Sequence, residues 1–449
     1  MKHNFIFIIV DSISYKYSWL NNEEFMPKLF KMKNEFKNFH NHFSTARNTR
    51  GAFASILSGL YPNLHKVNNR KHSFRSNKYG YLQKHMQKYG YRTFYYGTQP
   101  LFHSEKKNDN LDFNESIYLS PSMAEYFIPA LNYNKSIKKK LTSISNKPYF
   151  LFLHYTDVHA PYETPNINFL SPKYKNIRNF LIKNFFNLNI PRRFRSLYLS
   201  QKNFNLDNVV YNDYPNLKND CINPRGRWLT PERYPKFYDA VWSNDAMYNE
   251  YIDLMRMCSL YQDHALYEFL NYFKQENSKN NIIILVSDHT NNDIYPPMRQ
   301  CKTDFLLDKN LQIPMSILSF DKEITKKLKL VDNEYTYTSH IDFYNSFLSI
   351  FDNEYEDNDY EINLMNVKKK DRFLLAQMFD SRQDHNQFRM FNENDSINFF
   401  MKPSDIVKDI ISKNEIMNDI DDYKYSQYID YVSGLNNKVL DKRGSNEKN

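Results

Sequence analysis

Phe5-Ile-Phe-Ile-Ile-Val-Asp11 is a continuous apolar run that ends in a carboxylate. Because apolar residues do not alternate with polar ones here, the run predicts a central strand of a parallel sheet that is covered on both faces. Ligands of open α/β sheets gather at the carboxyl ends of the strands, so Asp11 is a candidate ligand. A helix N-cap formed together with Ser12 is an equally good interpretation of this aspartate.

Further segments of the chain fit the same kind of sheet. Apolar strands are predicted at Pro148 to Leu153, Ile282 to Val286 and Ile313 to Leu318, the last nearer the sheet edge because of Pro314. A helix that ends at Gly90 in a left-handed conformation leads into a strand from Thr93 to Tyr96. We therefore predict an α/β fold, with a mostly parallel central sheet and helices on both faces.

The length of 449 residues favours two folding units. We expect a catalytic domain over residues 1–352, with a variable insertion at about 167–235, and a small C-terminal α+β subdomain with a polar tail over 353–449. The insertion is rich in Asn, Lys, Arg and Tyr, and it is either a lid over the sheet edge or a surface excursion without a role in the site.

The charge balance indicates an anionic partner. Sixty Lys and Arg against 51 Asp and Glu give a net charge of +9, which suits an anionic substrate, nucleic acid or an acidic membrane surface. We expect no nucleic-acid partner, because no compact basic helix interleaved with aromatics and no zinc-finger spacing occurs. The three cysteines do not imply a disulfide framework. No signal peptide or transmembrane segment is recognised, so a cytoplasmic location is expected.

Ser44 to Pro62, STARNTRGAFASILSGLYP, places hydroxyls and arginines directly before a helical pattern of small residues. Thr49 has two interpretations. Its side chain can cap the first-turn amides of the helix, or its hydroxyl can act as a metal-activated nucleophile. The choice between them depends on the groups that the rest of the chain supplies.

Acidic and imidazole groups follow two of the predicted strands. His154, Asp157 and His159 come at the end of one strand, and Asp288 and His289 come at the end of another. His159 is expected to face the site, whereas His154 lies closer to the strand and can orient its neighbours. Asp288 and His289 can bind the same metal ion only if the chain turns there, because adjacent side chains on an extended strand diverge.

Helical spacing recurs from Phe237 to Phe273, and Ser339 to Phe351 predicts another helix. Asp263 lies on the first of these helices. We interpret it as an exposed helical carboxylate rather than as a supporting group of the site.

Taken in order, these motifs resemble the alkaline phosphatase and sulfatase-like superfamily, over roughly residues 4–352. Each motif is weak alone, but their common order is specific. The resemblance rests on these motifs: Val10-Asp11, the stretch from Thr49 to Pro62 that ends in Leu-Ser-Gly-Leu-Tyr-Pro, Gly90 to Thr93, His154 to Tyr162, Ser287 to His289, Ile313-Pro314 and Ser339 to Asp342.

The resemblance implies one divalent metal ion, which could be Mn, Zn, Ca or Mg. Asp11, Asp288 and His289 would bind it, with the Thr49 hydroxyl as a further ligand, and a dication lowers the pKa of a bound hydroxyl. His159 would donate a proton to the leaving oxygen. Candidate substrate-binding residues are Arg47, Arg50, His154 and Lys302, and candidate residues that support the ligands are Asp157 and His340.

The chain departs from classical sulfatases at the nucleophile. Sulfatases place a cysteine or serine there, followed two residues on by a small residue or proline and four on by arginine, and they convert it to formylglycine. This chain has Thr49, Gly51 and Phe53 instead. Threonine cannot give that aldehyde, and phospho-transferring branches of the superfamily use an unmodified threonine. Ser12 stands where many sulfatases have a second aspartate, which favours one metal.

The resemblance implies a metal-dependent hydrolase or transferase that cleaves phosphoesters through a covalent phosphothreonine at Thr49. The substrate is an anionic phospho- or sulfo-ester, and a glycan- or lipid-linked form is open. One alternative is sulfuric ester hydrolysis without formylglycine, which the sulfatase-like Asp157 to Tyr162 segment supports. An alternative of another class is a catalytically silent protein that binds an anionic glycan or a protein partner.

Overall fold

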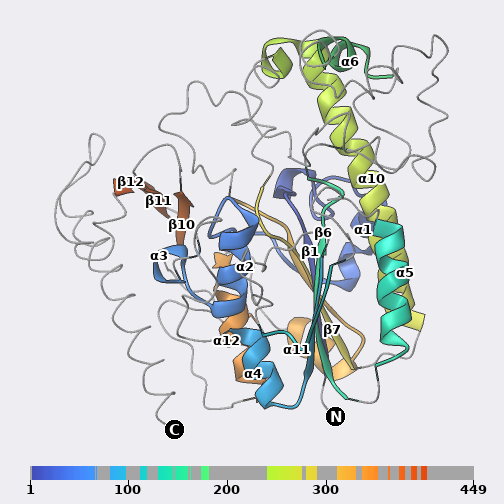
Figure 1. Cartoon of the computed structure of the whole chain (residues 1–449), viewed down its shortest axis with the longest axis vertical. Coiled ribbons are helices and arrows are strands. Elements are labelled where there is room, and N and C mark those ends of the chain that lie inside the picture. Colours follow the sequence, from blue (N-terminus) through green and yellow to red (C-terminus); the bar gives the residue numbers. More distant parts are fainter. Residues whose placement is uncertain are drawn as a thin grey trace, which may run out of the picture.

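A seven-stranded sheet lies at the centre of the described part of the chain (Figure 1). The structure is a computed structural model, and it describes residues 3–65, 67, 81–97, 112–118, 130–144, 147–159, 162, 173–181, 240–275, 280–290, 311–329, 336–351, 363–364, 374–379, 386–391 and 396–401. The strand order is β2-β8-β7-β1-β6-β4-β5. The strands are β1 (Asn4–Val10), β2 (Lys37–Phe39), β4 (Arg92–Gly97), β5 (Glu115–Tyr118), β6 (Tyr149–Tyr155), β7 (Asn281–Ser287) and β8 (Met315–Ser319).

The sheet is mostly parallel. β1 pairs in parallel with β6 and β7, and β4 pairs in parallel with β6 and β5. β8 runs antiparallel to β7, and the edge strand β2 runs antiparallel to β8. The predicted α/β class and the position of β8 near the sheet edge are therefore confirmed.

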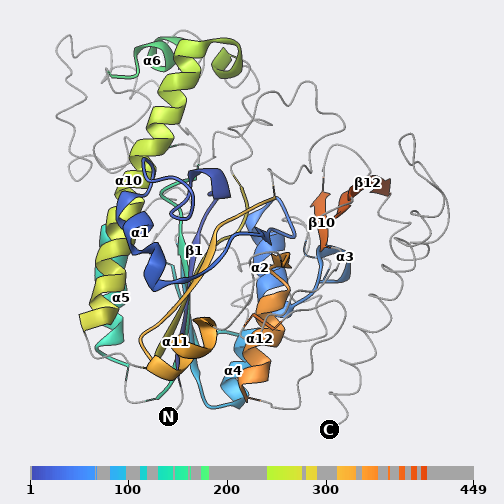
Figure 2. The same ribbon diagram turned by 180° about the vertical axis from the view of Figure 1, so that it is seen from behind.

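Helices cover both faces of the sheet (Figures 1 and 2). One face carries α1 (Pro27–Met32), α5 (Ala130–Leu141) and α10 (Asp245–Gln275). The other face carries α2 (Thr49–Ser58), α4 (Leu82–Lys88), α11 (Lys322–Lys329) and α12 (Asp342–Phe351). The remaining described elements are η1 (Tyr15–Tyr17), η2 (Lys33–Glu35), β3 (His42–Phe43), α3 (Pro62–His65), α6 (Lys175–Leu181), β9 (Thr338–Ser339), β10 (Leu374–Phe379), β11 (Asn386–Phe391) and β12 (Ser396–Met401).

The side chains of β1 alternate between two hydrophobic cores. Ile6, Ile8 and Val10 pack into the core under α5 and α10, while Phe5, Phe7 and Ile9 pack into the core under α2 and α12. Both sets are fully buried. The strand is apolar throughout because each face buries its own set, and burying one such side chain contributes about 1.5–3 kcal/mol.

Helix boundaries differ from the sequence predictions for local reasons. The helix predicted from Phe237 is interrupted at Asn244, whose side chain accepts a hydrogen bond from the amide of Met247 and caps α10. The helix predicted from Ser339 begins at Asp342, whose carboxylate accepts a hydrogen bond from the Ser339 amide. Gly90 has a φ of 83°, as its predicted place at a left-handed helix end requires.

Asp263 corrects a sequence interpretation, because it is buried rather than exposed. Its two carboxylate oxygens accept hydrogen bonds from the backbone amides of Lys28 and Leu29, each at 2.9 Å. These amides belong to the first turn of α1, whose own N-cap residue, Met26, makes no side-chain bond. A carboxylate on α10 thus satisfies the open amides of a helix distant in sequence.

A three-stranded antiparallel sheet, β10-β11-β12, occupies part of the expected C-terminal subdomain. It contacts the segment before α2, where the amide of Gln377 donates to the Thr45 carbonyl at 2.9 Å. The division into domains at residue 352 stays a prediction.

The expected insertion at 167–235 falls within the described residues only over 173–181, which includes α6. The amides of Asn176 and Ile177 donate to Glu250, near the start of α10. α6 therefore packs at the end of α10 that projects beyond the sheet (Figure 1). A role of the insertion as a lid stays a prediction.

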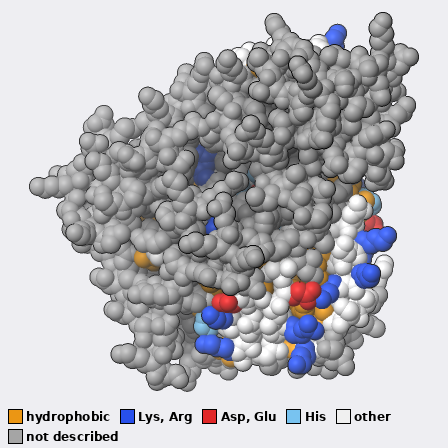
Figure 3. Space-filling model, in the orientation of Figure 1, with side chains coloured by type: hydrophobic (Ala, Val, Ile, Leu, Met, Phe, Trp, Pro, Cys, Tyr) orange, Lys and Arg blue, Asp and Glu red, His pale blue; other side chains and the backbone are white. Residues whose placement is uncertain are grey.

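Basic and acidic side chains lie side by side on the described lower part of the face in Figure 3. Ion pairs between described residues include Lys84 with Asp112 at 3.0 Å and Lys140 with Glu115 at 2.6 Å. Part of the positive charge is thus paired locally. None of the described helices combines the length and apolar character that crossing a membrane requires.

Asp263→Ala is expected to lower the free energy of unfolding by about 2–4 kcal/mol, because it leaves two α1 amides without their charged acceptor. Asp263→Asn keeps one acceptor oxygen and should lose less. Glu268→Ala, at an exposed position of the same helix, is the control and should change stability by less than about 0.5 kcal/mol. Urea denaturation measures all three, and equal stability of the two alanine variants would contradict the capping role.

Candidate active site

The ends of three parallel strands bring the candidate ligands to one edge of the sheet. Val10 at the end of β1 pairs with Tyr155 of β6 on one side and with Ser287 of β7 on the other. Asp11 follows β1 directly, and Asp288 follows β7 directly. Because the strands pair in this register, the two carboxylates emerge next to each other.

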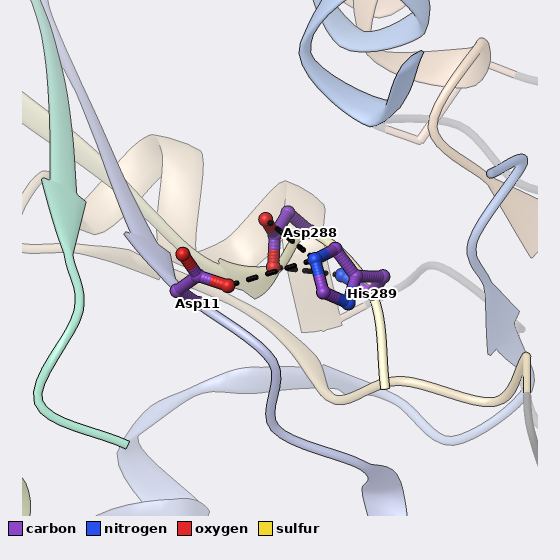
Figure 4. Close-up of side chains that lie close together, drawn as sticks. All are labelled: Asp11, Asp288 and His289. Atoms are coloured by element: carbon purple, nitrogen blue, oxygen red, sulfur yellow. Dashed lines mark hydrogen bonds and ion pairs between the residues drawn. The ribbon is translucent and has the colours of Figure 1, made fainter. Parts of the chain in front are cut away.

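Asp11, Asp288 and His289 point toward one another in the structure (Figure 4). Nε2 of His289 lies 3.6 Å from Oδ1 of Asp11 and 3.5 Å from Oδ2 of Asp288. All three residues are buried, and one potential ligand atom of each lies within 4.8 Å of those of the other two. The chain bends at Asp288, so the two adjacent residues of β7's end do face one centre.

One carboxylate oxygen in this cluster is buried without a hydrogen-bond partner. Oδ1 of Asp288 accepts from the His289 amide at 2.8 Å and from the Ser12 amide at 2.9 Å, whereas Oδ2 has no hydrogen-bond partner. An orphaned buried carboxylate oxygen is costly unless a cation or donor meets it. The carboxylates of Asp11 and Asp288, the imidazole of His289 and the Thr49 hydroxyl form a donor set that fits a divalent cation.

The two carboxylates have opposite pKa shifts. Burial alone would raise the pKa of Asp11, but His159, His154 and His289 outweigh it and hold that pKa well below its ordinary value. The pKa of Asp288 is raised, first by burial and then by the charge of Asp11. A dication between these groups would remove the repulsion between the two carboxylates.

The tautomer of His289 follows from its hydrogen bonds. Nδ1 lies 3.0 Å from the carbonyl oxygen of Thr290, which can only accept, so Nδ1 carries the hydrogen. In the neutral form of the ring, Nε2 is then the nitrogen with the lone pair. It lies 3.3 Å from Oγ1 of Thr49, which can donate to it.

Thr49 is not the cap of α2. The N-cap is Asn48, whose Oδ1 accepts a hydrogen bond from the Gly51 amide at 2.8 Å. The capping interpretation of Thr49 is therefore wrong, and its hydroxyl faces His289. Gly51 permits this geometry, because a Cβ at Gly51 would lie only 2.9 Å from Cβ of Ala46.

His154 contacts Asp11 rather than an open surface. It is fully buried, and its Nε2 lies 3.0 Å from Oδ2 of Asp11. The ring of Phe53 packs edge-on against it, with ring centroids 5.0 Å apart. The sequence interpretation placed His154 with the substrate-binding residues, but its position suits holding Asp11.

The other candidates from the sequence differ in burial and in the groups that they contact. His159 is partly exposed and close enough for its charge to act on Asp11. Arg47 is buried and Arg50 is partly buried, just before and within the first turn of α2. Asp157 is buried and accepts from the Ala130 amide at 3.1 Å, so it fixes the start of α5. Lys302 lies outside the described residues.

His340 is hydrogen-bonded to the last residue of β7. Its Nε2 donates to the Ser287 carbonyl at 3.2 Å, and its Nδ1 lies 3.5 Å from Oγ1 of Thr45. Burial lowers the pKa of His340 to about 3, although the bond to the Ser287 carbonyl acts in the opposite direction. A neutral imidazole thus links the residue before Asp288 to the segment before Thr49.

Sequence reasoning missed three contacts of the site: the cap at Asn48, the packing of Phe53 on His154, and the bonds of Ser12 to the cluster. The preference of asparagine for N-caps could have indicated the first. The other two depend on residues that only the fold brings together.

A family model of sulfatases matches residues 3–214 and 227–353, which is most of the chain. A search of curated proteins finds no match.

Solved structures share the fold at low sequence identity. A protein solved in complex with its substrate D-glucosamine-2-N,6-O-disulfate aligns with a TM-score of 0.60 and 14% identity, covering 99% of this chain and 99% of that chain. An alkaline phosphatase superfamily protein from Vibrio parahaemolyticus gives 0.55 and 12%, covering 99% and 88%. A phosphonate monoester hydrolase from Silicibacter pomeroyi gives 0.52 and 12%, covering 99% and 96%.

The depressed pKa of His340 predicts a loss of stability in acid. The unfolded chain binds the proton below about pH 6.5, whereas the folded protein binds it only near pH 3, so the free energy of unfolding falls as the pH drops through this window. The slope for one proton is about 1.4 kcal/mol per pH unit.

His340→Gln is the matched variant, since its amide can still donate to the Ser287 carbonyl but cannot titrate. Urea denaturation between pH 7 and pH 4 should show a shallower loss of stability in the variant. Identical slopes in both proteins would contradict a neutral buried His340.

Proposed function

Because this chain belongs to the sulfatase family, we propose that it is a metal-dependent enzyme that cleaves phosphoesters through a covalent phosphothreonine at Thr49. The observation that carries the proposal is the position of the Thr49 hydroxyl. It lies 3.3 Å from Nε2 of His289 while Asn48 takes over the capping of α2. A threonine held at a buried cluster of carboxylates and imidazoles, and not needed as a cap, suits a nucleophile.

Asp11, Asp288, His289 and Thr49 would hold one divalent cation. When bound, such an ion lowers the pKa of the nucleophilic hydroxyl and neutralises charge on the attacked ester. The orphaned Oδ2 of Asp288 and the lone pair on Nε2 of His289 both favour this assignment. His154 and His340 hold Asp11 and the end of β7 in place.

The reaction that we propose has two displacements at phosphorus. In the first, the Thr49 hydroxyl gives its proton to solvent water, its oxygen bonds to phosphorus, and the bond from phosphorus to the ester oxygen breaks as that oxygen takes a proton from His159. In the second, water or an acceptor hydroxyl gives its proton to the now neutral His159 as its oxygen bonds to phosphorus, and the Thr49 oxygen departs and takes a proton from solvent water. His159 suits both steps, because it is partly exposed beside the buried Asp11.

Arg47, Arg50 and Lys302 are proposed to hold the non-bridging oxygens of the substrate. An arginine at the start of α2 can give bidentate contact to a phosphoryl group, and a helix N-terminus also favours an anion. The substrate is an anionic ester, with a glycan- or lipid-linked form open. The cytoplasmic location expected from the sequence stays a prediction.

Sulfate-ester hydrolysis is the second candidate, because the matched family is that of sulfatases. The threonine favours phosphoesters, since it cannot be converted to the formylglycine aldehyde. A panel of aryl phosphate monoesters, aryl phosphate diesters and aryl sulfates, each assayed with Mn, Zn, Mg and Ca, separates the two candidates. Faster turnover of aryl sulfate than of both phosphoesters would overturn the phosphoester assignment.

Thr49→Ala is expected to reduce phosphoester turnover to background, a loss of at least about 10³-fold, because it removes the attacking oxygen. Thr49→Ser keeps a hydroxyl and should retain part of the activity. Circular dichroism checks that α2 remains folded in both variants. Turnover by the alanine variant near the wild-type rate would exclude Thr49 as the nucleophile.

Asp288→Asn is expected to remove the bound divalent ion, because it replaces the carboxylate with the orphaned oxygen by a neutral amide. Metal analysis of the purified proteins should find one ion per wild-type chain and a clear deficit in the variant. Asp245→Asn, at an exposed position of α10, is the matched control and should keep the ion. An intact wild-type protein without any ion would favour the catalytically silent binder.

A further inference from the structure

Ser12 contacts each of the three clustered residues, although it was not among the candidate ligands. Its backbone amide donates to Oδ1 of Asp288 at 2.9 Å. Its hydroxyl donates to Oδ1 of Asp11 at 2.9 Å. The hydroxyl oxygen, Oγ of Ser12, also lies 3.3 Å from Nδ1 of His289. One small residue thus reaches two carboxylates and one imidazole that come from two different strands.

The backbone of Ser12 has an unusual conformation that makes these contacts possible. Its φ is 59°, and among the described residues only Ser12 and Asp112 combine a positive φ with a side chain. The left-handed conformation costs free energy in a residue other than glycine. Here it turns the amide toward Asp288 and the side chain toward Asp11, and such strain is typical of functional sites.

Each hydrogen in the network around Ser12 has an acceptor. The Ser12 hydroxyl has one hydrogen, which it donates to Asp11, and its lone pairs remain to accept. Nδ1 of His289 carries a hydrogen, which the Ser12 oxygen and the Thr290 carbonyl can share as acceptors at 3.3 and 3.0 Å. Two acceptors on Nδ1 fix the plane of the ring, and Nε2 therefore points at the centre of the cluster.

Asp288 and His289 are thus each held by one atom and present another, whereas both carboxylate oxygens of Asp11 have partners. Asp288 is held at Oδ1 and presents Oδ2, which has no hydrogen-bond partner. His289 is held at Nδ1 and presents Nε2. Asp11 is held by His154 at Oδ2, and Ser12 orients its Oδ1. Groups that orient ligands in this way raise metal affinity, and their loss typically costs 10–100-fold.

We propose that Ser12 is a positioning residue that preorganises Asp11, Asp288 and His289 for a divalent cation through its hydroxyl. The inference rests on the proposed function only in taking the occupant of the cluster to be such a cation. The role belongs to the side chain, and the strained backbone serves to aim it. Removing the hydroxyl should therefore lower metal affinity without unfolding the protein.

The test compares two substitutions that remove the hydroxyl in different ways. Ser12→Gly relaxes the positive φ, whereas Ser12→Ala keeps the Cβ and the backbone strain. Both keep the amide that donates to Asp288. Titration calorimetry of the metal-free full-length protein with Mn²⁺ should show a loss of about 10–100-fold in affinity for both variants.

Ser14→Ala is the matched control, because Ser14 is another buried serine in the same segment and its hydroxyl has no hydrogen-bond partner. Its Mn²⁺ affinity should stay within about twofold of wild type, since it touches none of the ligands. The thermal midpoint of each metal-free variant, by circular dichroism, reports folding separately from binding.

Co²⁺ absorption bands give a readout of ligand geometry that does not depend on turnover. They should change in Ser12→Gly and Ser12→Ala and remain unchanged in Ser14→Ala. Wild-type affinity and bands in Ser12→Gly, or a loss confined to Ser12→Ala, would overturn the role of the hydroxyl. Absence of Mn²⁺ binding by the wild-type protein would instead overturn the metal site and this inference together, so the two failures are distinguishable.

Discussion

The parallel pairing of β6, β1 and β7 is the constraint on which the site depends. Val10 pairs with both Tyr155 and Ser287, so the three strands end at the same level. A shift of one residue in the β1–β7 register would move Asp288 away from Asp11 and turn its side chain to the other face. The two hydrophobic cores fix this register, since the residues of β1 are buried on both faces. Packing far from the chemistry thus sets the distance between the two carboxylates.

Burial of charge at this edge is the second constraint. Asp11 and Asp288 are 1% and 0% exposed, and transferring an ionised carboxylate from water costs several kcal/mol unless partners compensate. His154, the amides of Ser12 and His289, and the Ser12 hydroxyl supply part of that compensation. Oδ2 of Asp288 accepts no hydrogen bond from the described residues, and Nε2 of His289 lies 3.5 Å from it. Burying these two carboxylates therefore lowers the free energy of unfolding. A divalent cation bound between them would offset that cost.

The sequence predicts the sheet better than it predicts the contacts of the site. Continuous apolar runs gave β1, β6 and β7 to within two residues, because strands buried on both faces leave no polar positions. The short β2 and β3 lack such runs and were not predicted. The sequence also suggested Asp11, Asp288 and His289 from their places after strands, whereas Asp263 was misjudged because its partners, the α1 amides, lie 234 and 235 positions away. The sequence suggested Ser12 as part of an N-cap with Asp11 and as a replacement for aspartate, but not as a support of the cluster, since its positive φ is not readable from the sequence.

The residues after Thr49 are consistent with our proposal that this threonine is an unmodified nucleophile. In sulfatases that form formylglycine, an arginine follows four residues after the nucleophile, and here Phe53 occupies that place on α2. Its ring packs edge-on against His154 and also against Phe152, each with centroids 5.0 Å apart. Because His154 in turn bonds Asp11, the helix that begins with Thr49 is linked through Phe53 to the first candidate ligand. Phe53 offers no charged group at the position where those sulfatases have an arginine. Its ring shields the buried His154 from water and fixes the orientation of the imidazole. Threonine at position 49 and phenylalanine at position 53 are therefore consistent with each other under the proposed function, in which α2 positions the hydroxyl and no conversion to formylglycine takes place.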